Sequence, residues 1–195
     1  MERFIFVKLS FLFILSFLLT SCTYTGVAMT GAQALYDHHN LQKKISNHYA
    51  TLKAYREMRL KNDAFKDTNL SISSFNNVML ITGQAPQAWQ KHEIGKLVKK
   101  IADDREVYNF AEVTNPISIL TELSDAWITT KIKAQYVAAD EIDPNLIKVI
   151  TENGTVYLMG IIPHDEADVA VQIAKETRGV QSVIKLFSYV TVSKT

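Results

Sequence analysis

The hydrophobic pattern begins with an apolar stretch near the N-terminus. The eleven residues from Leu9 to Leu19 carry no charge, and Arg3 and Lys8 precede them. A helix that spans a bilayer needs about 20 apolar residues, so this stretch is too short to cross a membrane. A charged start followed by a short apolar region is typical of a signal peptide. The pattern therefore predicts a signal peptide at residues 1–21.

Helical periodicity appears next, between residues 40 and 61. Apolar side chains recur there every three or four positions, as expected for an amphipathic helix: Leu41, Ile45, Tyr49, Leu52 and Tyr55. Residues 22–36 are small and weakly polar, which predicts a spacer before the first folded domain. Asn115-Pro116 interrupts regular structure, because proline restricts the residue before it. Residues 116–123 are therefore predicted to form a linker.

An internal repeat organises the rest of the chain. The segment 80–86 matches the segment 157–163, with Gly83 aligned on Gly160, 77 positions later. The match extends in both directions: Leu70-x-Ile72 aligns with Ile147-x-Val149, Asn76-Asn77 with Asn153-Gly154, and residues 107–113 with residues 184–190. One structural unit therefore occurs twice in this chain.

The second copy shows most clearly what each unit contains. Asn153-Gly154 lies between two β-type segments, and both residues tolerate the positive φ of a type I′ hairpin turn. Gly160 is predicted to end the second strand. A helical pattern then continues to Arg178, where Gly179 is a natural stop. A third strand follows, parallel to the second because a helix connects them.

With a helix starting near Asp125, the order of elements is αββαβ. The sequence thus predicts an α+β protein with two tandem domains, at residues 37–115 and 124–195. Each domain is expected to have a small three-stranded mixed sheet packed against two helices.

Cys22 follows the apolar stretch directly. The sequence Leu19-Thr20-Ser21-Cys22 resembles the bacterial lipobox, in which the cysteine thiol receives a diacylglycerol and the new N-terminus is acylated. Cys22 is the only cysteine, so it has no partner for an intramolecular disulfide. The alternative is an ordinary signal peptide followed by an unmodified cysteine.

The repeated unit resembles the BON domain of bacterial envelope proteins. Two such units behind a lipobox are similar to the division- and outer-membrane-stress-associated lipid-binding lipoproteins, the DolP family. The likeness is strongest in the second unit, at residues 125–133 and 151–154 and in the turn Gly179-Val180-x-x-Val183. In the first unit, Phe75-Asn76-Asn77 replaces the usual glycine-bearing turn. The resemblance implies the BON fold and a lipid-anchored position at the outer membrane, with the domains facing the periplasm. Thr23 agrees with this location, because an Asp after the cysteine would favour retention at the inner membrane.

Composition and charge argue against several other functions. The 21 basic residues are balanced by 20 acidic ones, so no overall positive field attracts nucleic acid. His38, His39 and His48 lack the spacing of a metal site, and no second cysteine completes one. No nucleophile with a recognisable base, phosphate loop or cofactor motif occurs. We therefore expect a non-enzymatic protein without metal or cofactor.

The helix from Asp125 to about Ala139 is the candidate binding element. Ile128, Ile132 and Tyr136 form a stripe that is sufficient to cover the sheet. A second stripe beside it combines an indole, lysines and small or branched residues: Trp127, Thr130, Lys131, Lys133, Ala134 and Val137. Tryptophan and lysine are favoured at membrane interfaces, so we expect this stripe to bind anionic phospholipid. In the alternative, Trp127 packs within the protein.

Two functions follow from these features. The first is an outer-membrane lipoprotein that binds anionic phospholipid through its second domain and supports envelope integrity. The second is an interaction scaffold for partners in outer-membrane assembly or cell-wall remodelling.

The lipobox generates the first prediction. Cys22→Ala should abolish lipoprotein processing and acylation, because the chain contains no other thiol. Mass spectrometry of the membrane fraction measures the acyl mass directly. A mature protein that starts at Cys22 without acyl mass would contradict the lipoprotein interpretation.

Overall fold

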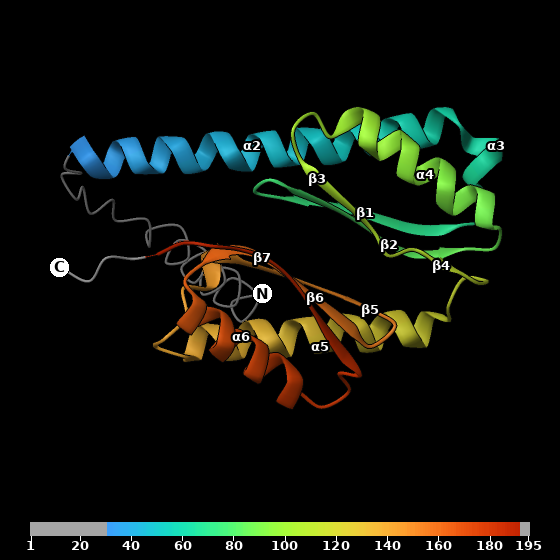
Figure 1. The fold of residues 1–195 in the computed structure, drawn as a ribbon. Coiled ribbons are helices and arrows are strands. Elements are labelled where there is room, and N and C mark those ends of the chain that lie inside the picture. Colours follow the sequence, from blue (N-terminus) through green and yellow to red (C-terminus); the bar gives the residue numbers. More distant parts are fainter. Residues whose placement is uncertain (1–30, 192–195) are drawn as a thin grey trace, which may run out of the picture. The chain divides into compact units, whose positions relative to one another are not determined.

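The computed structural model describes residues 31–191, with side chains from residue 42 onward (Figure 1). The predicted signal peptide and Cys22 lie outside the described residues. The first domain contains, in order, α2 (Gly31–Leu60), α3 (Asn62–Phe65), β1 (Asn69–Phe75), β2 (Val78–Ala85), α4 (Ala88–Ile101), β3 (Glu106–Asn109) and β4 (Glu112–Val113). The second contains α5 (Ile119–Ala138), a short 3-10 helix (Pro144–Leu146), β5 (Ile147–Glu152), β6 (Thr155–Ile162), α6 (His164–Glu176) and β7 (Ser182–Tyr189).

The two domains have the same topology. In each, the first two strands form an antiparallel hairpin, and the chain returns through a helix to pair in parallel with the second strand. In the first domain this last strand is interrupted, so that β3 and β4 pair separately with β2. The predicted α+β class and the repeated αββαβ order are confirmed.

Gly83 and Gly160 occupy equivalent places in the two domains. Gly83 pairs with Leu70 and Gly160 with Ile147, so the aligned glycines share one register. A Cβ at Gly83 would lie 2.0 Å from the carbonyl oxygen of Asn69, and one at Gly160 would lie 2.6 Å from that of Leu146. The first strand approaches the second too closely at this point for any side chain. The prediction that these glycines end their strands is wrong, because two further residues of β2 and of β6 still pair with the strand on the other side.

The turns that connect the elements are largely as predicted. Asn153 and Gly154 have φ values of 47° and 73°, which confirms the type I′ geometry of the second hairpin. Helix α6 ends at Glu176, two residues before the predicted end. Gly179, with a φ of 97°, lies in the turn that follows.

Two predicted irregular segments are helical. Ser118 caps α5, accepting a hydrogen bond from the backbone N–H of Thr121 at 3.3 Å, so the helix already begins at Ile119. Most of the predicted linker 116–123 is therefore part of α5. Residues 31–36, predicted as part of the spacer, belong to α2. Alanine, glutamine and leucine in this stretch are good helix formers.

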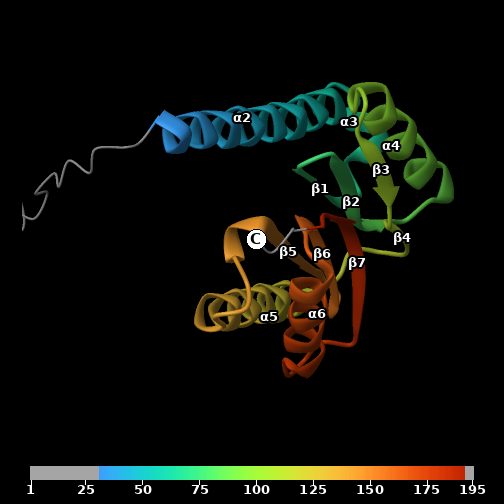
Figure 2. The ribbon, with the colours of Figure 1, turned by 60° about the vertical axis from the view of Figure 1, so that its left-hand side comes forward.

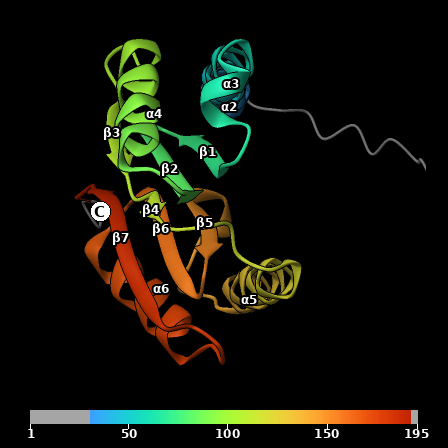
Figure 3. The same ribbon diagram turned by 90° about the vertical axis from the view of Figure 1, so that its right-hand side faces the viewer.

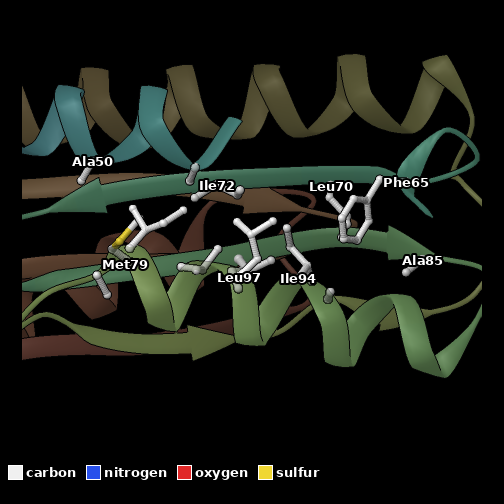
Figure 4. Packing of buried hydrophobic residues seen from close by; sticks show 14 residues of the cluster. Ala50, Phe65, Leu70, Ile72, Met79, Ala85, Ile94 and Leu97 are labelled. Atoms are coloured by element: carbon white, nitrogen blue, oxygen red, sulfur yellow. The ribbon is translucent and has the colours of Figure 1, made fainter. Parts of the chain in front are cut away.

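Helix α2 packs on the first sheet through Ala50 and Ala54, together with Tyr55 and Met58, so most of the predicted apolar stripe does not face the core. Ala50 and Ala54 are buried against the first sheet, and Figure 4 shows Ala50 on the side of α2 that faces Ile72 and Met79. Ile45, Tyr49 and Leu52 are exposed on the opposite side. An amphipathic stripe normally marks the buried side of a helix. Here two alanines face the sheet, and Tyr55 of the stripe also packs there, its hydroxyl accepting a hydrogen bond from the backbone N–H of Ile72 at 2.9 Å.

Each sheet is apolar on both faces. Figures 2 and 3 show α2 and α4 against one sheet, and α5 and α6 against the other. On these covered faces lie Met79 and Ile81 in the first domain, and Val156 and Leu158 in the second. The alternate residues of β2 and β6 form a third core cluster, which joins the two sheets: Val78, Leu80, Tyr157 and Met159, together with Leu186. Tyr157 also packs against the Phe110 ring, with 5.3 Å between centroids.

Polar side chains border this sheet-to-sheet contact. Gln84 Nε2 donates a hydrogen bond to Glu152 Oε1 at 2.6 Å, and Lys148 Nζ donates to the carbonyl oxygen of Ser74 at 3.2 Å. Burial raises the pKa of Glu152 above its ordinary value, and nearby carboxylates add to the effect, although the Gln84 hydrogen bond acts in the opposite direction. Burial likewise lowers the pKa of Lys148.

The raised pKa of Glu152 generates a prediction about pH. The folded protein holds this proton more tightly than the unfolded chain, so Glu152 costs stability as the pH rises through its folded-state pKa. Glu152→Gln should therefore increase the free energy of unfolding at about pH 7, with a smaller effect at about pH 4. Urea unfolding at both pH values measures this, and Glu141→Gln at an exposed position is the matched control. A larger gain at the lower pH would contradict the assignment.

Candidate functional site

Helix α5 carries two apolar stripes on opposite sides. The inner stripe consists of Ile128, Ile132 and Tyr136, all buried in the core of the second domain. The Tyr136 hydroxyl donates a hydrogen bond to the carbonyl oxygen of Ala170 on α6 at 2.9 Å. The prediction that these three residues cover the sheet is confirmed.

The second stripe faces away from the core. All six residues predicted to form the binding surface are exposed: Trp127, Thr130, Lys131, Lys133, Ala134 and Val137. The exposed fraction of Trp127 is 49%, and it belongs to none of the buried core clusters of the described residues. Its indole lies near the Lys131 ammonium, which is 5.4 Å from the ring centroid.

The exposed stripe is longer than the sequence analysis predicted. Because α5 begins at Ile119, three further exposed apolar residues precede Trp127: Ile119, Leu120 and Leu123. Their spacing continues the helical period, since Ile119, Leu123 and Trp127 are four residues apart. The Ser118 cap was the available signal for this earlier start. We call the resulting surface the outer stripe: Ile119, Leu120, Leu123, Trp127, Thr130, Ala134 and Val137.

The basic and acidic residues of α5 differ in their position around the helix. Lys131 and Lys133 lie on either side of the outer stripe and are exposed. Glu122 accepts a hydrogen bond from Asn69 Nδ2 at 2.8 Å, and Asp125 is buried. The lysines are therefore available at the helix surface, whereas both carboxylates are bound to groups of the protein. Asp125 therefore does not lie beside the lysines on the exposed side of the helix.

Asp125 fixes the orientation of α5 against the second sheet. Its Oδ2 accepts a hydrogen bond from the backbone N–H of Asn153 at 2.6 Å, and its Oδ1 accepts one from Gly154 at 2.9 Å. The carboxylate thus satisfies both N–H groups of the hairpin turn. Hydrogen bonds to a charged group contribute about 1.5–3 kcal/mol each, so α5 is held firmly in one rotational setting. In this setting the outer stripe points away from the domain.

The described residues contain neither a candidate metal cluster nor a membrane-spanning helix. In the part of the chain that the structure describes, no group of three or more His, Cys, Asp or Glu side chains could hold a metal ion. His164, the first residue of α6, stacks on Tyr189, with 3.8 Å between ring centroids. None of the described helices combines the length and apolar character that crossing a membrane requires.

Comparison with known proteins agrees with the fold and the repeat. The BON domain family matches residues 55–115 and again residues 124–191. The chain is 33% identical to the 21 kDa hemolysin of Actinobacillus pleuropneumoniae over 69% of its own length and 68% of that protein. It is 32% identical to the outer membrane lipoprotein DolP of Haemophilus influenzae, over 68% of this chain and 72% of DolP.

A further relative matches over more of the chain at lower identity. Osmotically-inducible protein Y of Escherichia coli is 25% identical, over 87% of this chain and 91% of that protein. Two matches to the BON model, on the two domains that the sheets define, account for the repeat of the αββαβ unit. The chain is therefore a protein with two BON domains and belongs to the DolP family.

Proposed function

We propose that this chain is a lipid-anchored, non-enzymatic protein of the outer membrane, facing the periplasm, that binds anionic phospholipid through its second BON domain. The outer stripe of α5 is the observation that carries the proposal. It exposes an indole and several aliphatic side chains along one helix, with a lysine on either side. In this role the protein supports the integrity of the cell envelope.

The outer stripe matches the physical requirements of a membrane interface. From Ile119 to Val137 the helix is about 27 Å long, so it can lie along the membrane surface over several lipid headgroups. Burying apolar side chains contributes about 25 cal/mol per Å². Lys131 and Lys133 each add about 1 kcal/mol near an anionic leaflet. The indole of Trp127 suits the headgroup region, where one end of the ring is apolar and the other is hydrated.

The predicted lipid anchor and the outer stripe have different roles in this proposal. Two or more acyl chains on Cys22 are sufficient to hold the chain on a membrane. The name of its Haemophilus influenzae relative, an outer membrane lipoprotein, supports the same location. The anchor sets where the protein resides, and the outer stripe then recognises the lipid.

A scaffold function is the second candidate, and the first domain supports it. Ile45, Tyr49 and Leu52 form a separate exposed apolar stripe on α2. This surface is independent of the lipid contact on α5. A protein of outer-membrane assembly or cell-wall remodelling is the partner class that we propose for it.

The outer stripe generates a prediction that separates binding from folding. Trp127→Glu should leave the melting temperature close to that of the wild type, because the indole is half exposed. The same variant should lose most of its affinity for anionic vesicles. Ile132→Glu should instead unfold the second domain, because truncating a buried aliphatic side chain alone costs about 2–5 kcal/mol and a buried charge adds to that cost.

Vesicle sedimentation and thermal unfolding measure the two effects. Trp89→Glu is the matched control, because Trp89 on α4 of the first domain has a similar exposed fraction of 51%. It should bind vesicles like the wild type. If a folded Trp127→Glu protein also binds vesicles normally, the outer stripe is not the lipid contact, and the scaffold function is favoured.

A further inference from the structure

A cavity with several polar lining residues lies where the first hairpin, α2 and the second domain meet. It has a volume of about 370 Å³, and its lining includes Lys43, Asn47, Asn76, Arg105 and Ser188. None of the described residues that line it is acidic. The cavity therefore brings together two cationic groups with amides and hydroxyls. None of its lining residues belongs to the outer stripe.

Arg105 is the unusual member of this lining. Its side chain is only 13% exposed, and the carboxylate that it contacts, Asp103 Oδ2, is 3.8 Å away on a side chain that is 76% exposed. Arg105 donates hydrogen bonds to Ser46 Oγ at 2.6 Å and to the carbonyl oxygen of Ala102 at 3.2 Å. Its Nε–H finds no acceptor among the described residues. A largely buried guanidinium with so little neutralisation is costly unless an anion compensates it.

The other lining groups suit the same kind of ligand. Asn47 Oδ1 accepts a hydrogen bond from Ser74 Oγ, which leaves its amide N–H groups as donors. Lys43 adds a second positive charge from α2. Arginine, lysine and amide donors around one cavity are the groups that bind phosphate oxygens.

We propose that this cavity binds a phosphate group, held by Arg105 and Lys43 and by the amides of the first hairpin. The phosphate comes either from a phospholipid headgroup or from a free phosphate compound, and the chemistry of recognition is the same. The site uses no residue of the outer stripe, so phosphate binding there does not depend on whether α5 contacts lipid.

The test uses residues 23–195, which include every described element. Inorganic phosphate is titrated in one arm, and a short-chain phosphatidylglycerol below its micelle concentration in the other, with NMR of the backbone amides and of the arginine Nε–H. Saturable shifts at Asn76, Asn77 and the Arg105 Nε–H are expected in at least one arm. Saturation with phosphate identifies a free-phosphate site, and saturation with the lipid alone identifies a headgroup site. Saturation in neither arm overturns the proposal.

Matched variants assign the binding to the cavity. Lys43→Ala and Arg105→Gln should each weaken the affinity about tenfold or more, since each removes a charged hydrogen-bond donor. Lys44→Ala, which removes the same charge from the neighbouring position outside the lining, should bind like the wild type. Equal weakening by Lys43→Ala and Lys44→Ala would mean unspecific attraction and would contradict the proposal.

Two further variants keep the test decisive. If Arg105→Gln does not fold, Ser188→Asp replaces it, because Ser188 is exposed and a carboxylate there should repel the anion from the cavity. Normal binding by a folded Ser188→Asp protein would count against the site. Trp127→Glu should bind phosphate like the wild type, so a failure of the lipid contact on α5 remains distinguishable from a failure of this site.

Discussion

The two small sheets can bury only one face each against their own helices, and the rest of the structure depends on this constraint. β2 and β6 are apolar on both sides, and a three-stranded sheet with one open apolar face is not stable in water. The two open faces cover each other through the cluster that contains Leu80, Tyr157 and Met159. The helices therefore lie on the outside of both sheets, and their far sides are left to solvent or to partners.

This arrangement determines what the far sides of the helices can do. The inner stripe of α5 and the Asp125 carboxylate commit one side of that helix to the second domain. The opposite side is then free to carry Trp127 and the other residues of the outer stripe without loss of stability. The stability of the domain and the proposed lipid contact thus depend on different residues of one helix, which allows the two to be tested separately.

The sequence predicted the features that depend on local order and on the repeat. Gly83 and Gly160 aligned because both sites lack room for a Cβ, and Asn153-Gly154 fixed a turn by itself. The hydrophobic periodicity predicted the stripes, but not always which side of the helix faces the core. On α2, Ile45, Tyr49 and Leu52 of the apolar stripe are exposed, because the side of the helix that faces the sheet carries Ala50, Ala54 and Tyr55.

Other features arise only in three dimensions. The sheet-to-sheet cluster and the cavity around Arg105 join residues that are far apart in the chain, and no local pattern marks them. The start of α5 departs from the prediction for a different reason. Pro116 indicates a linker, whereas Ser118 two residues later caps the helix.

The central claim is that Trp127 enters the lipid interface, and its fluorescence tests this most directly. The chain has two tryptophans, so Trp89→Phe leaves Trp127 as the only indole. With anionic vesicles whose acyl chains carry bromine, the account predicts a blue shift of the emission and strong quenching. Unchanged emission that is still quenched by an aqueous agent, in protein that sediments with the vesicles, would contradict it.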